Sequence, residues 1–165
     1  MAVSITELLK RSVLFSGLTP EQLEQIAALS RKATYNDGDV IIQEGAPSNE
    51  VYIIREGMVE VLISKIAVAD VPGAPQLTPI VRLGNGQFFG EMALVDRGAR
   101  SATVRCAKDG TALYVIPRED FWELCDSNHH IGYIVMRNIA FDLSFKLRHQ
   151  NLQARLTEAG GGGGS

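Results

Sequence analysis

The sequence predicts an α+β fold, in which a jelly-roll β-barrel of short antiparallel strands is flanked by N-terminal helices and a long C-terminal helix. Between residues 33 and 117, short runs rich in β-branched residues alternate with glycine turns, which is typical of an all-β barrel. On either side, at 4–30 and 118–158, apolar residues recur at the three- and four-residue steps of a helix. The chain therefore has the order helix, barrel, helix.

The N-terminal helical zone has well-marked starts. Leu8 and Leu9 provide the apolar face of a first helix. Before a second helix, Thr19 stands at the N-cap position and Pro20 at the first helical position. Gln22 follows the cap at the spacing of a capping box, so we expect the second helix to begin here.

The barrel zone contains six runs with strand character. Each is short, rich in β-branched residues and bounded by a glycine or a polar turn. Segment 68–79, VADVPGAPQLTP, is too rich in proline and glycine for a central strand, and it predicts a long, mobile hairpin loop. The six runs are DVIIQEG, EVYIIREG, MVEVLISKIAV, TPIVRLGNG, SATVRCA and ALYVIP.

The C-terminal helix, which starts near His129, has two apolar stripes where a surface helix needs one. One stripe must face the barrel. The other needs a second surface, either the N-terminal helices or the same helix of another copy. We assign Met136, Ile139, Ala140, Leu143 and Leu147 to one stripe, and Ile134, Phe141, Phe145, Leu152 and Leu156 to the other.

The composition fits one soluble globular domain, residues 1–159. Of the 165 residues, 45% are hydrophobic and 21% are charged, which is enough for a core of its own. The net charge of −3 argues against a partner such as a nucleic acid polymer, because that binding needs many Lys and Arg side chains to neutralise phosphates. Residues 160–165, GGGGGS, have the composition of a flexible linker or an added tail.

No apolar run approaches the roughly 18 residues that span a bilayer, and the N-terminus lacks the pattern of a secretory signal. We therefore expect a cytoplasmic protein without a membrane partner.

Neither the cysteines nor the histidines form a metal-binding pattern. Cys106 and Cys125 have no CxxC spacing, and we interpret both as buried thiols. His129 and His130 are adjacent at a helix start, His149 lies far along that helix, and the barrel zone contains no HxH pair. We therefore expect no metal site, no cofactor and no catalytic residue, which disfavours a metal-dependent enzyme on a barrel scaffold.

The stretch GQFFGEMALVDRGARSATVRC, residues 86–106, places charged residues at the edges of apolar segments. GEMALVD can form one or two helical turns whose N–H groups converge at Gly90, where the missing Cβ lets a ligand approach the backbone. Arg100, beyond the loop, can offer its guanidinium to two phosphate oxygens. Glu91 would repel a phosphate, so its useful role is to accept a hydrogen bond from a hydroxyl such as a ribose 2′-OH. Phosphate and ribose hydroxyl together describe a small nucleotide.

This stretch resembles the phosphate-binding cassette of cyclic nucleotide-binding domains, which occur in catabolite-activator-type regulators, regulatory subunits of cAMP-dependent protein kinase and cyclic-nucleotide-gated channels. The resemblance is strongest in FFGEMALVDRGARSATVRC. It extends over roughly residues 10–150, through LFSGLTPEQLEQIA, YNDGDVIIQEGAPSNEVYIIREGMVEV and VIPREDFWEL. The long 68–79 segment departs from the family pattern, so we expect the barrel rim there to differ.

By position, the resemblance implies a role for each cassette residue. Gly90 and Ala93 would donate backbone N–H groups to the cyclic phosphate, and Arg100 would pair with its charge. Ser101 would add a hydroxyl or backbone donor, and Glu91 would accept a hydrogen bond from the ribose 2′-OH. Met92 and Ala102 complete the cassette positions.

The resemblance also implies a base site under the last helix. Val81 and Leu83 would lie against the base, and Gln150 or Asn151 would bond its edge as the helix closes over the pocket. Ser101 suits cAMP, as in bacterial activators, and also tolerates cGMP, so we expect cAMP as the preferred ligand and cGMP as a weaker one.

The implied function is a receptor or regulatory module that binds a 3′,5′-cyclic nucleotide. The alternative is a ligand-free structural or dimerisation module with a degenerate form of the same fold. The resemblance to dimeric activators implies a possible homodimer through the C-terminal helix, whose stripe continues to Leu156. We expect no helix-turn-helix output domain after that helix, and the downstream protein partner stays open.

Overall fold

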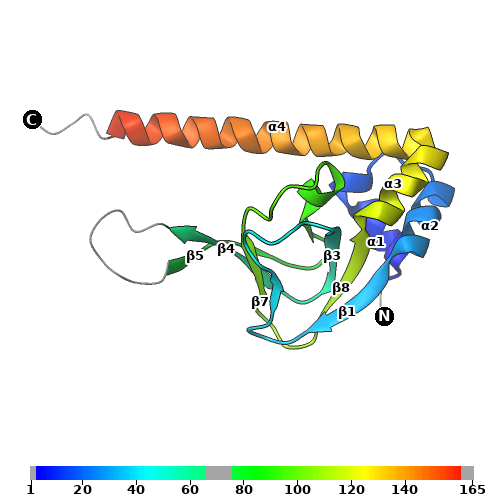
Figure 1. The fold of residues 1–165 in the computed structure, drawn as a ribbon, viewed down its shortest axis with the longest axis horizontal. Coiled ribbons are helices and arrows are strands. Elements are labelled where there is room, and N and C mark those ends of the chain that lie inside the picture. Colours follow the sequence, from blue (N-terminus) through cyan, green and yellow to red (C-terminus); the bar gives the residue numbers. More distant parts are fainter. Residues whose placement is uncertain (1–2, 66–75, 161–165) are drawn as a thin grey trace, which may run out of the picture.

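Two four-stranded antiparallel sheets form the centre of the fold (Figure 1). The computed structural model describes residues 3–65 and 76–160. One sheet has the strand order β1-β8-β3-β6 and the other has the order β2-β7-β4-β5, so the predicted jelly-roll barrel is confirmed, with its two sheets not joined into a closed ring among the described residues. The strands are β1 (Arg31–Tyr35), β2 (Val40–Ile42), β3 (Glu50–Glu56), β4 (Val59–Lys65), β5 (Gln76–Leu83), β6 (Phe88–Phe89), β7 (Thr103–Cys106) and β8 (Thr111–Pro117).

Helices precede, interrupt and follow the strands, which confirms the predicted order. At the start of the second α-helix, Thr19 Oγ1 accepts a hydrogen bond from the Gln22 amide at 3.2 Å, and Gln22 Oε1 accepts one from the Thr19 amide at 3.0 Å. The capping box predicted from the sequence is therefore present. The helices are α1 (Ile5–Arg11), 3-10 helix η1 (Val13–Phe15), α2 (Pro20–Leu29), 3-10 helix η2 (Glu91–Leu94), α3 (Arg118–Ser127) and α4 (His129–Gly160).

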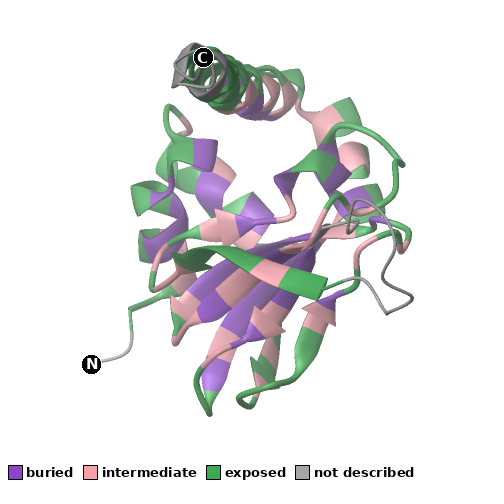
Figure 2. Cartoon of the chain, turned by 90° about the vertical axis from the view of Figure 1, so that its left-hand side faces the viewer, coloured by how far each residue is buried: buried purple, intermediate pink, exposed green. Residues whose placement is uncertain are grey.

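Strand β3 separates two hydrophobic clusters and is buried on both faces. Val51 and Ile53 belong to the cluster under the helices, whereas Tyr52 and Ile54 belong to the cluster inside the barrel. A strand covered on both sides needs apolar residues at successive positions, which explains why EVYIIRE lacks a simple alternation. Figure 2 shows this buried layer between the helices and the open rim of the barrel.

The first half of α4 packs on the N-terminal helices. Ile131, Val135 and Ile139 are buried there, and Asn138 Nδ2 donates hydrogen bonds to the carbonyl oxygens of Leu14 and Ser16 at 3.0 and 2.9 Å. The N-terminal helices therefore supply the cover that the sequence left open for this half of the helix.

The two stripes that we assigned to α4 were partly wrong. Ile134, of the second stripe, is buried beside Gly17, as cover by the N-terminal helices requires, whereas Ala140 and Leu147 of the first stripe are exposed. Beyond residue 140, apart from the half-buried Leu143, the apolar side chains of both stripes are exposed, because α4 continues past the N-terminal helices (Figure 1). The exposed apolar side chains there are Phe141, Phe145, Leu147, Leu152 and Leu156.

Strand β5 begins earlier than the sequence suggested. We predicted a loop over 68–79, but β5 starts at Gln76 and includes Pro79. β5 is an edge strand, and its register with β4 shifts between Val61 and Leu62, so the missing N–H of Pro79 is tolerated. The rest of the predicted loop, 68–75, lies outside the described residues.

The ends of several elements also differ slightly from the prediction. β1 begins at Arg31 rather than at 33, and α4 ends at Gly160 rather than at 158, while 161–165 lie outside the described residues. Cys106 is buried and Cys125 is half-buried, and both are free thiols. No helix within the described ranges combines the length and hydropathy of a bilayer span.

Candidate functional site

Gly90 joins β6 to η2 at the centre of the predicted cassette. Its φ of 77° lies in the left-handed region, which disfavours any side chain. A Cβ at this position would lie 2.8 Å from Arg100 Nη1 and 3.3 Å from the Glu50 carbonyl oxygen. Conformation and space therefore both require glycine here.

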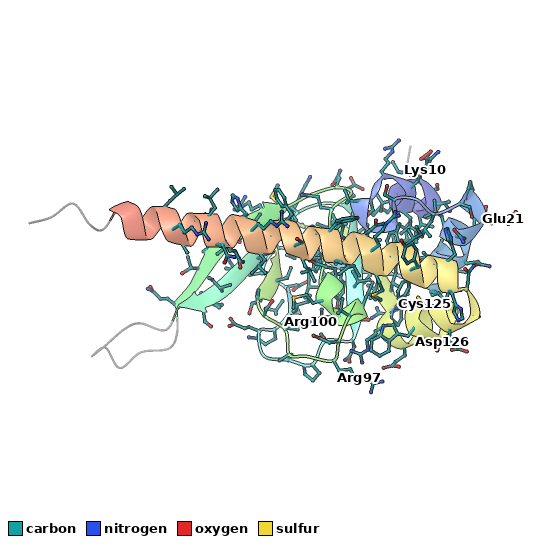
Figure 3. The ribbon with its side chains drawn as sticks, turned by 90° about the horizontal axis from the view of Figure 1, so that it is seen from above. Lys10, Glu21, Arg97, Arg100, Cys125 and Asp126 are labelled. Atoms are coloured by element: carbon teal, nitrogen blue, oxygen red, sulfur yellow. The ribbon has the colours of Figure 1, made fainter. Side chains whose placement is uncertain are left out.

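The Arg100 side chain lies directly beside Gly90. Its Nη2 donates a hydrogen bond to the Glu50 carbonyl oxygen at 2.7 Å, and its Nη1 donates one to the Gly90 carbonyl oxygen at 3.3 Å. Partial burial lowers the pKa of the guanidinium, whereas nearby Tyr52 and Glu50 act to raise it. Seen from above, Arg100 and Arg97 lie on the same side of α4 (Figure 3).

Tyr52 and Glu50, on β3, both contact Arg100. The centre of the Tyr52 ring lies 5.9 Å from the guanidinium carbon, and the ring stacks on Phe89 at 4.9 Å between centroids. The Tyr52 hydroxyl donates a hydrogen bond to Glu50 Oε1 at 2.8 Å, and Arg31 pairs with Glu50 Oε2 at 2.8 Å. Burial and the bond to Glu50 raise the pKa of Tyr52 far above its usual range, so the ring stays neutral.

A small cavity of about 100 Å³ opens beside Arg100. Sites for small ligands usually measure about 300 to 1,000 Å³, so a nucleotide would need the surroundings of this cavity to open or to lie partly outside it. The cavity is lined by Ile41, Ile42, Gln43, Ala46, Pro47, Asn49, Glu50, Tyr52 and Arg100.

The next cassette residues lie at the start of η2. Glu91 is almost buried, with 8% of its surface exposed, although it is charged. Met92 is exposed, and the side chain of Ala93 is fully buried. The Ala93 amide, which the resemblance assigned to the phosphate, donates here to the Gly90 carbonyl oxygen at 3.1 Å and closes the 3-10 turn.

Lys146, on α4, neutralises Glu91, and the sequence analysis did not predict this pair. Lys146 Nζ lies 2.8 Å from Glu91 Oε1 and 2.9 Å from Asp142 Oδ2, one helical turn earlier. Partial burial acts to lower the pKa of Lys146, but the bonds to Glu91 and Asp142 raise it overall. Glu91, Gly90 and Arg100 thus form one charged site beneath α4.

The cassette continues from Arg100 into β7. Ser101 is exposed and Ala102 is half-buried. Thr103 is buried, and its Oγ1 accepts a hydrogen bond from the Glu44 amide at 3.1 Å, which ties the cassette to the β2–β3 loop.

Helix α3 holds the other end of η2. Trp122 Nε1 donates a hydrogen bond to the Leu94 carbonyl oxygen at 2.7 Å. Arg118 is buried and donates to the carbonyl oxygens of Ser48 and Asp96. The cassette is therefore fixed to the helical layer at its C-terminal end and to α4 through Glu91.

The base-contacting residues implied by the resemblance lie further from the cassette. Leu83 is half-buried against the barrel cluster, and Val81, opposite Val61, is exposed on the edge strand. Gln150 and Asn151 are exposed on α4. Gln150 follows Lys146 by four residues and shares its side of the helix, whereas Asn151 is turned away from that line.

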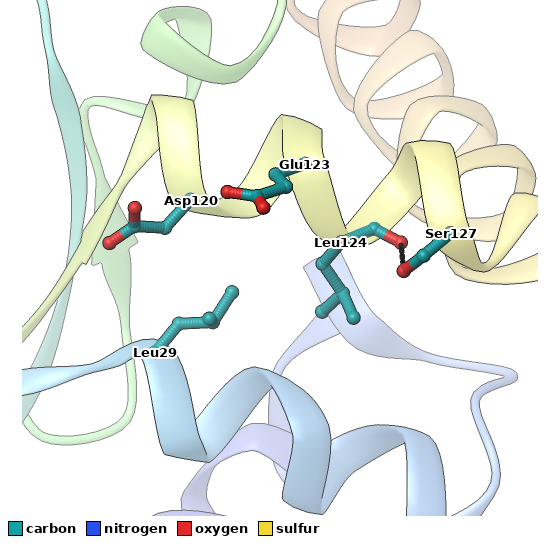
Figure 4. A pocket seen from close by; sticks show the side chains of 5 residues that line it. All are labelled: Leu29, Asp120, Glu123, Leu124 and Ser127. Carbon is teal, nitrogen blue, oxygen red and sulfur yellow. Dashed lines mark hydrogen bonds between the residues drawn. The ribbon is translucent and has the colours of Figure 1, made fainter.

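A second cavity, of about 330 Å³, lies between α2 and α3 (Figure 4). It contains no cassette residue, and its lining combines two leucines with two carboxylates. Across the described ranges, 3–65 and 76–160, no three His, Cys, Asp or Glu side chains are grouped so that they could hold a metal ion. The lining residues are Leu29, Asp120, Glu123, Leu124 and Ser127.

The chain is similar to several known proteins. The family model for the cyclic nucleotide-binding domain matches residues 32–128. The chain is 30% identical to the Cyclic AMP receptor protein of Thermus thermophilus, over 90% of this chain and 63% of that protein. It is 32% identical to a cGMP-dependent protein kinase of Drosophila melanogaster (isozyme 2 forms cD5/T2), over 78% of this chain and 13% of the kinase.

A solved structure shows the same architecture. The catabolite activator protein of Thermus thermophilus superposes with a TM-score of 0.75 and 29% identity, over 89% of this chain and 63% of that one. The chain thus spans less than two thirds of the length of these relatives. Since the family model covers more than half of the chain, including the whole cassette, the chain belongs to the cyclic nucleotide-binding domain family.

Proposed function

We propose that this chain is a cytoplasmic receptor module that binds a 3′,5′-cyclic nucleotide, with cAMP preferred over cGMP. The observation that supports this most directly is the placement of Arg100, Gly90 and Glu91 together. A guanidinium, a backbone without a Cβ and a nearly buried carboxylate match the phosphate and the ribose hydroxyl of one small ligand.

Arg100 is suited to the cyclic phosphate. In the described structure it is held by two backbone carbonyl oxygens, which position the guanidinium but supply only partial negative charge. A phosphate provides a full negative charge and two oxygens in the fork geometry of arginine. The neutral Tyr52 ring beneath it keeps the guanidinium in place without competing for its charge.

The base is proposed to extend from the cassette toward β5. Leu83 and Val81 offer an apolar surface there, and α4 runs above it (Figure 1). Of the two polar residues implied by the resemblance, Gln150 is better placed, because it shares the side of α4 that Lys146 directs at the cassette. Closing of α4 would bring Gln150 to the base edge.

The proposed activity is binding, not catalysis. The names of the relatives point to both cyclic nucleotides, a receptor for cAMP and a kinase that depends on cGMP. The preference for cAMP is based on Ser101, which is exposed beside Arg100 and provides a small hydroxyl without the added methyl group of threonine.

We also propose that the exposed half of α4 forms a homodimer. Phe141, Phe145, Leu152 and Leu156 are each more than half exposed, and they recur at steps of four and seven residues along the helix. A second copy of the same helix would cover this stripe. A ligand-free dimerisation module is the competing function, because the stripe alone would serve it equally well.

Calorimetric titration with cAMP and cGMP separates the two functions. Arg100→Ala should weaken cAMP binding by about thirtyfold to several thousandfold, because a buried charge loses its partner. Arg97→Ala is the matched control, since Arg97 lies on the same loop but pairs with Glu119 and the Trp122 ring. If the unaltered protein binds neither nucleotide, or if Arg100→Ala binds as tightly as Arg97→Ala, the proposed receptor function is wrong.

A further inference from the structure

Arg118, at the start of α3, is a buried cation that lies outside the cassette. Its side chain is only 6% exposed, although arginine is almost never buried without partners. Its Nη1 donates hydrogen bonds to the carbonyl oxygens of Ser48 and Asp96, and its Nη2 lies 3.1 Å from Glu119 Oε1. Its guanidinium carbon lies 5.1 Å from the centre of the Trp122 ring. Contacts on several sides therefore fix the Arg118 side chain.

The two carbonyl oxygens that Arg118 binds belong to two loops that pair with each other. Ser48 lies between β2 and β3, and Asp96 lies between η2 and β7. Across the pair, the Arg100 amide donates a hydrogen bond to the Ala46 carbonyl oxygen at 2.8 Å. Ser48 Oγ donates one to the Gly98 carbonyl oxygen, also at 2.8 Å. The guanidinium of Arg118 thus joins both loops next to the point where they carry Arg100.

Arg118 also fixes the part of β3 that orients the Arg100 side chain. Its backbone amide donates a hydrogen bond to the Asn49 carbonyl oxygen at 2.8 Å. The next carbonyl oxygen along the chain, that of Glu50, accepts the bond from Arg100 Nη2 at 2.7 Å. Burial lowers the pKa of Arg100, and the charge of Arg118 acts in the same direction, so the two guanidinium groups are close enough to interact.

We propose that Arg118 is a positioning residue for the cyclic nucleotide and that it acts through Arg100. By bonding to the carbonyl oxygens of Ser48 and Asp96, it keeps the two loops in register and directs the Arg100 guanidinium at the phosphate. This inference rests on the proposed function and deepens it, because it assigns part of the affinity to a residue that lies behind the ligand site.

Arg118→Lys is the first test. Lysine keeps the positive charge, but it lacks the planar fork that reaches two carbonyl oxygens and a carboxylate together. Calorimetric titration should show cAMP binding about tenfold weaker than in the unaltered protein. Arg97→Lys is the matched control, because Arg97 contacts the same Trp122 ring and pairs with the same Glu119 carboxylate but is 68% exposed. It should bind cAMP as the unaltered protein does.

Ser48→Ala is a second test that leaves Arg118 in place. It removes the hydroxyl that donates to the Gly98 carbonyl oxygen and should weaken cAMP binding about threefold. Because both substitutions break the same series of bonds, the double variant should bind about as weakly as Arg118→Lys alone. Melting without nucleotide is measured for each variant, and affinities are measured well below the melting temperatures. A merely structural role would lower the melting temperature and leave the affinity unchanged.

The outcomes separate the positioning role from the receptor function. If the unaltered protein binds neither cAMP nor cGMP, the proposed function fails and the role of Arg118 fails with it. If the unaltered protein binds but Arg118→Lys binds as tightly as Arg97→Lys, the positioning role alone is overturned. Losses that add in the double variant would also overturn it, since Ser48 would then not transmit the effect of Arg118. If Arg118→Lys does not fold, an unchanged affinity in Ser48→Ala overturns the role.

Discussion

At the scale of single residues, the cassette depends on groups outside it. Arg100 is positioned by a backbone carbonyl of β3 and by the ring of Tyr52, and Glu91 is covered by a lysine of α4. Gly90 is the residue that allows these groups to meet, because any Cβ there would touch the guanidinium. Both the fold and the site therefore require glycine at position 90.

Gly90→Ala should lose both stability and ligand. The positive φ costs about 1–2 kcal/mol for an alanine, and the new Cβ would displace Arg100 Nη1, which lies 2.8 Å away. Gly86→Ala is a matched control, since Gly86 has a φ of 84° but no atom within 4 Å of its added Cβ. Thermal melting should fall in both variants, while cAMP affinity should fall only in Gly90→Ala. An equal loss of affinity would contradict the role of Gly90 in the site.

Cys125 should react slowly with alkylating reagents near neutral pH. Burial, with a smaller effect of the Asp126 charge, raises its thiol pKa from 9.0 to about 11, so the reactive thiolate is scarce. The stability that comes from keeping the thiol neutral is fully present below pH 9 and is lost as the pH rises toward 11. Iodoacetamide labelling followed from pH 7 to 11 in Cys106→Ser checks this, and rapid labelling at pH 8 would contradict it.

At the scale of elements, α4 has two halves with different surroundings. Up to Ile139 it is a core helix against η1 and the other helices, and from residue 144 to 156 its side chains are exposed. The sequence could not show this division. Ile134 and Phe141 are seven residues apart, which is the spacing expected along a dimer seam. Ile134 packs beside Gly17 and is buried, whereas Phe141 lies further along α4 and is exposed.

The cassette could be predicted from the sequence because its residues lie close together in the chain. Gly90, Glu91 and Arg100 fall within one short stretch, so spacing alone brought them to one loop. Lys146 could not be found in this way, since it lies 55 residues from Glu91 and their meeting depends on the rotation and direction of α4. Pro79 was misjudged for a related reason, because its tolerance depends on β5 being an edge strand.

The exposed stripe of α4 should prove to be a dimer seam. Phe145→Glu together with Leu152→Glu introduces charges at two exposed positions, so the fold should persist while self-association is lost. Light scattering should then give a monomer, whereas Val40→Glu, an exposed apolar residue on β2, should leave the dimer intact. A dimer that survives both charges would contradict the seam, as would a monomer in the unaltered protein.

At the scale of the whole molecule, the site connects the barrel, α3 and α4. The cassette is bonded to the barrel through Arg100 and Glu50, to α3 through Trp122, and to α4 through Lys146. A ligand that replaces one of these contacts affects the others, because they meet at Gly90 and the short η2 segment that follows it. Ligand binding should therefore stabilise the domain as a unit and not only its loop.

Thermal unfolding should rise with cAMP and stay unchanged with 5′-AMP. At a concentration a hundred times the dissociation constant, a ligand specific for the folded state adds about 2.7 kcal/mol. For a domain of this size that corresponds to roughly 5–10 °C. The open phosphate of 5′-AMP has an extra charge and lacks the ring that the cassette is proposed to enclose, so it should bind far more weakly.

Trp122 is the only tryptophan in the chain and is bonded to the cassette at Leu94, so its fluorescence reports the melting of this site directly. Arg100→Ala should remove the shift, and equal shifts with both nucleotides would indicate a general nucleotide site instead.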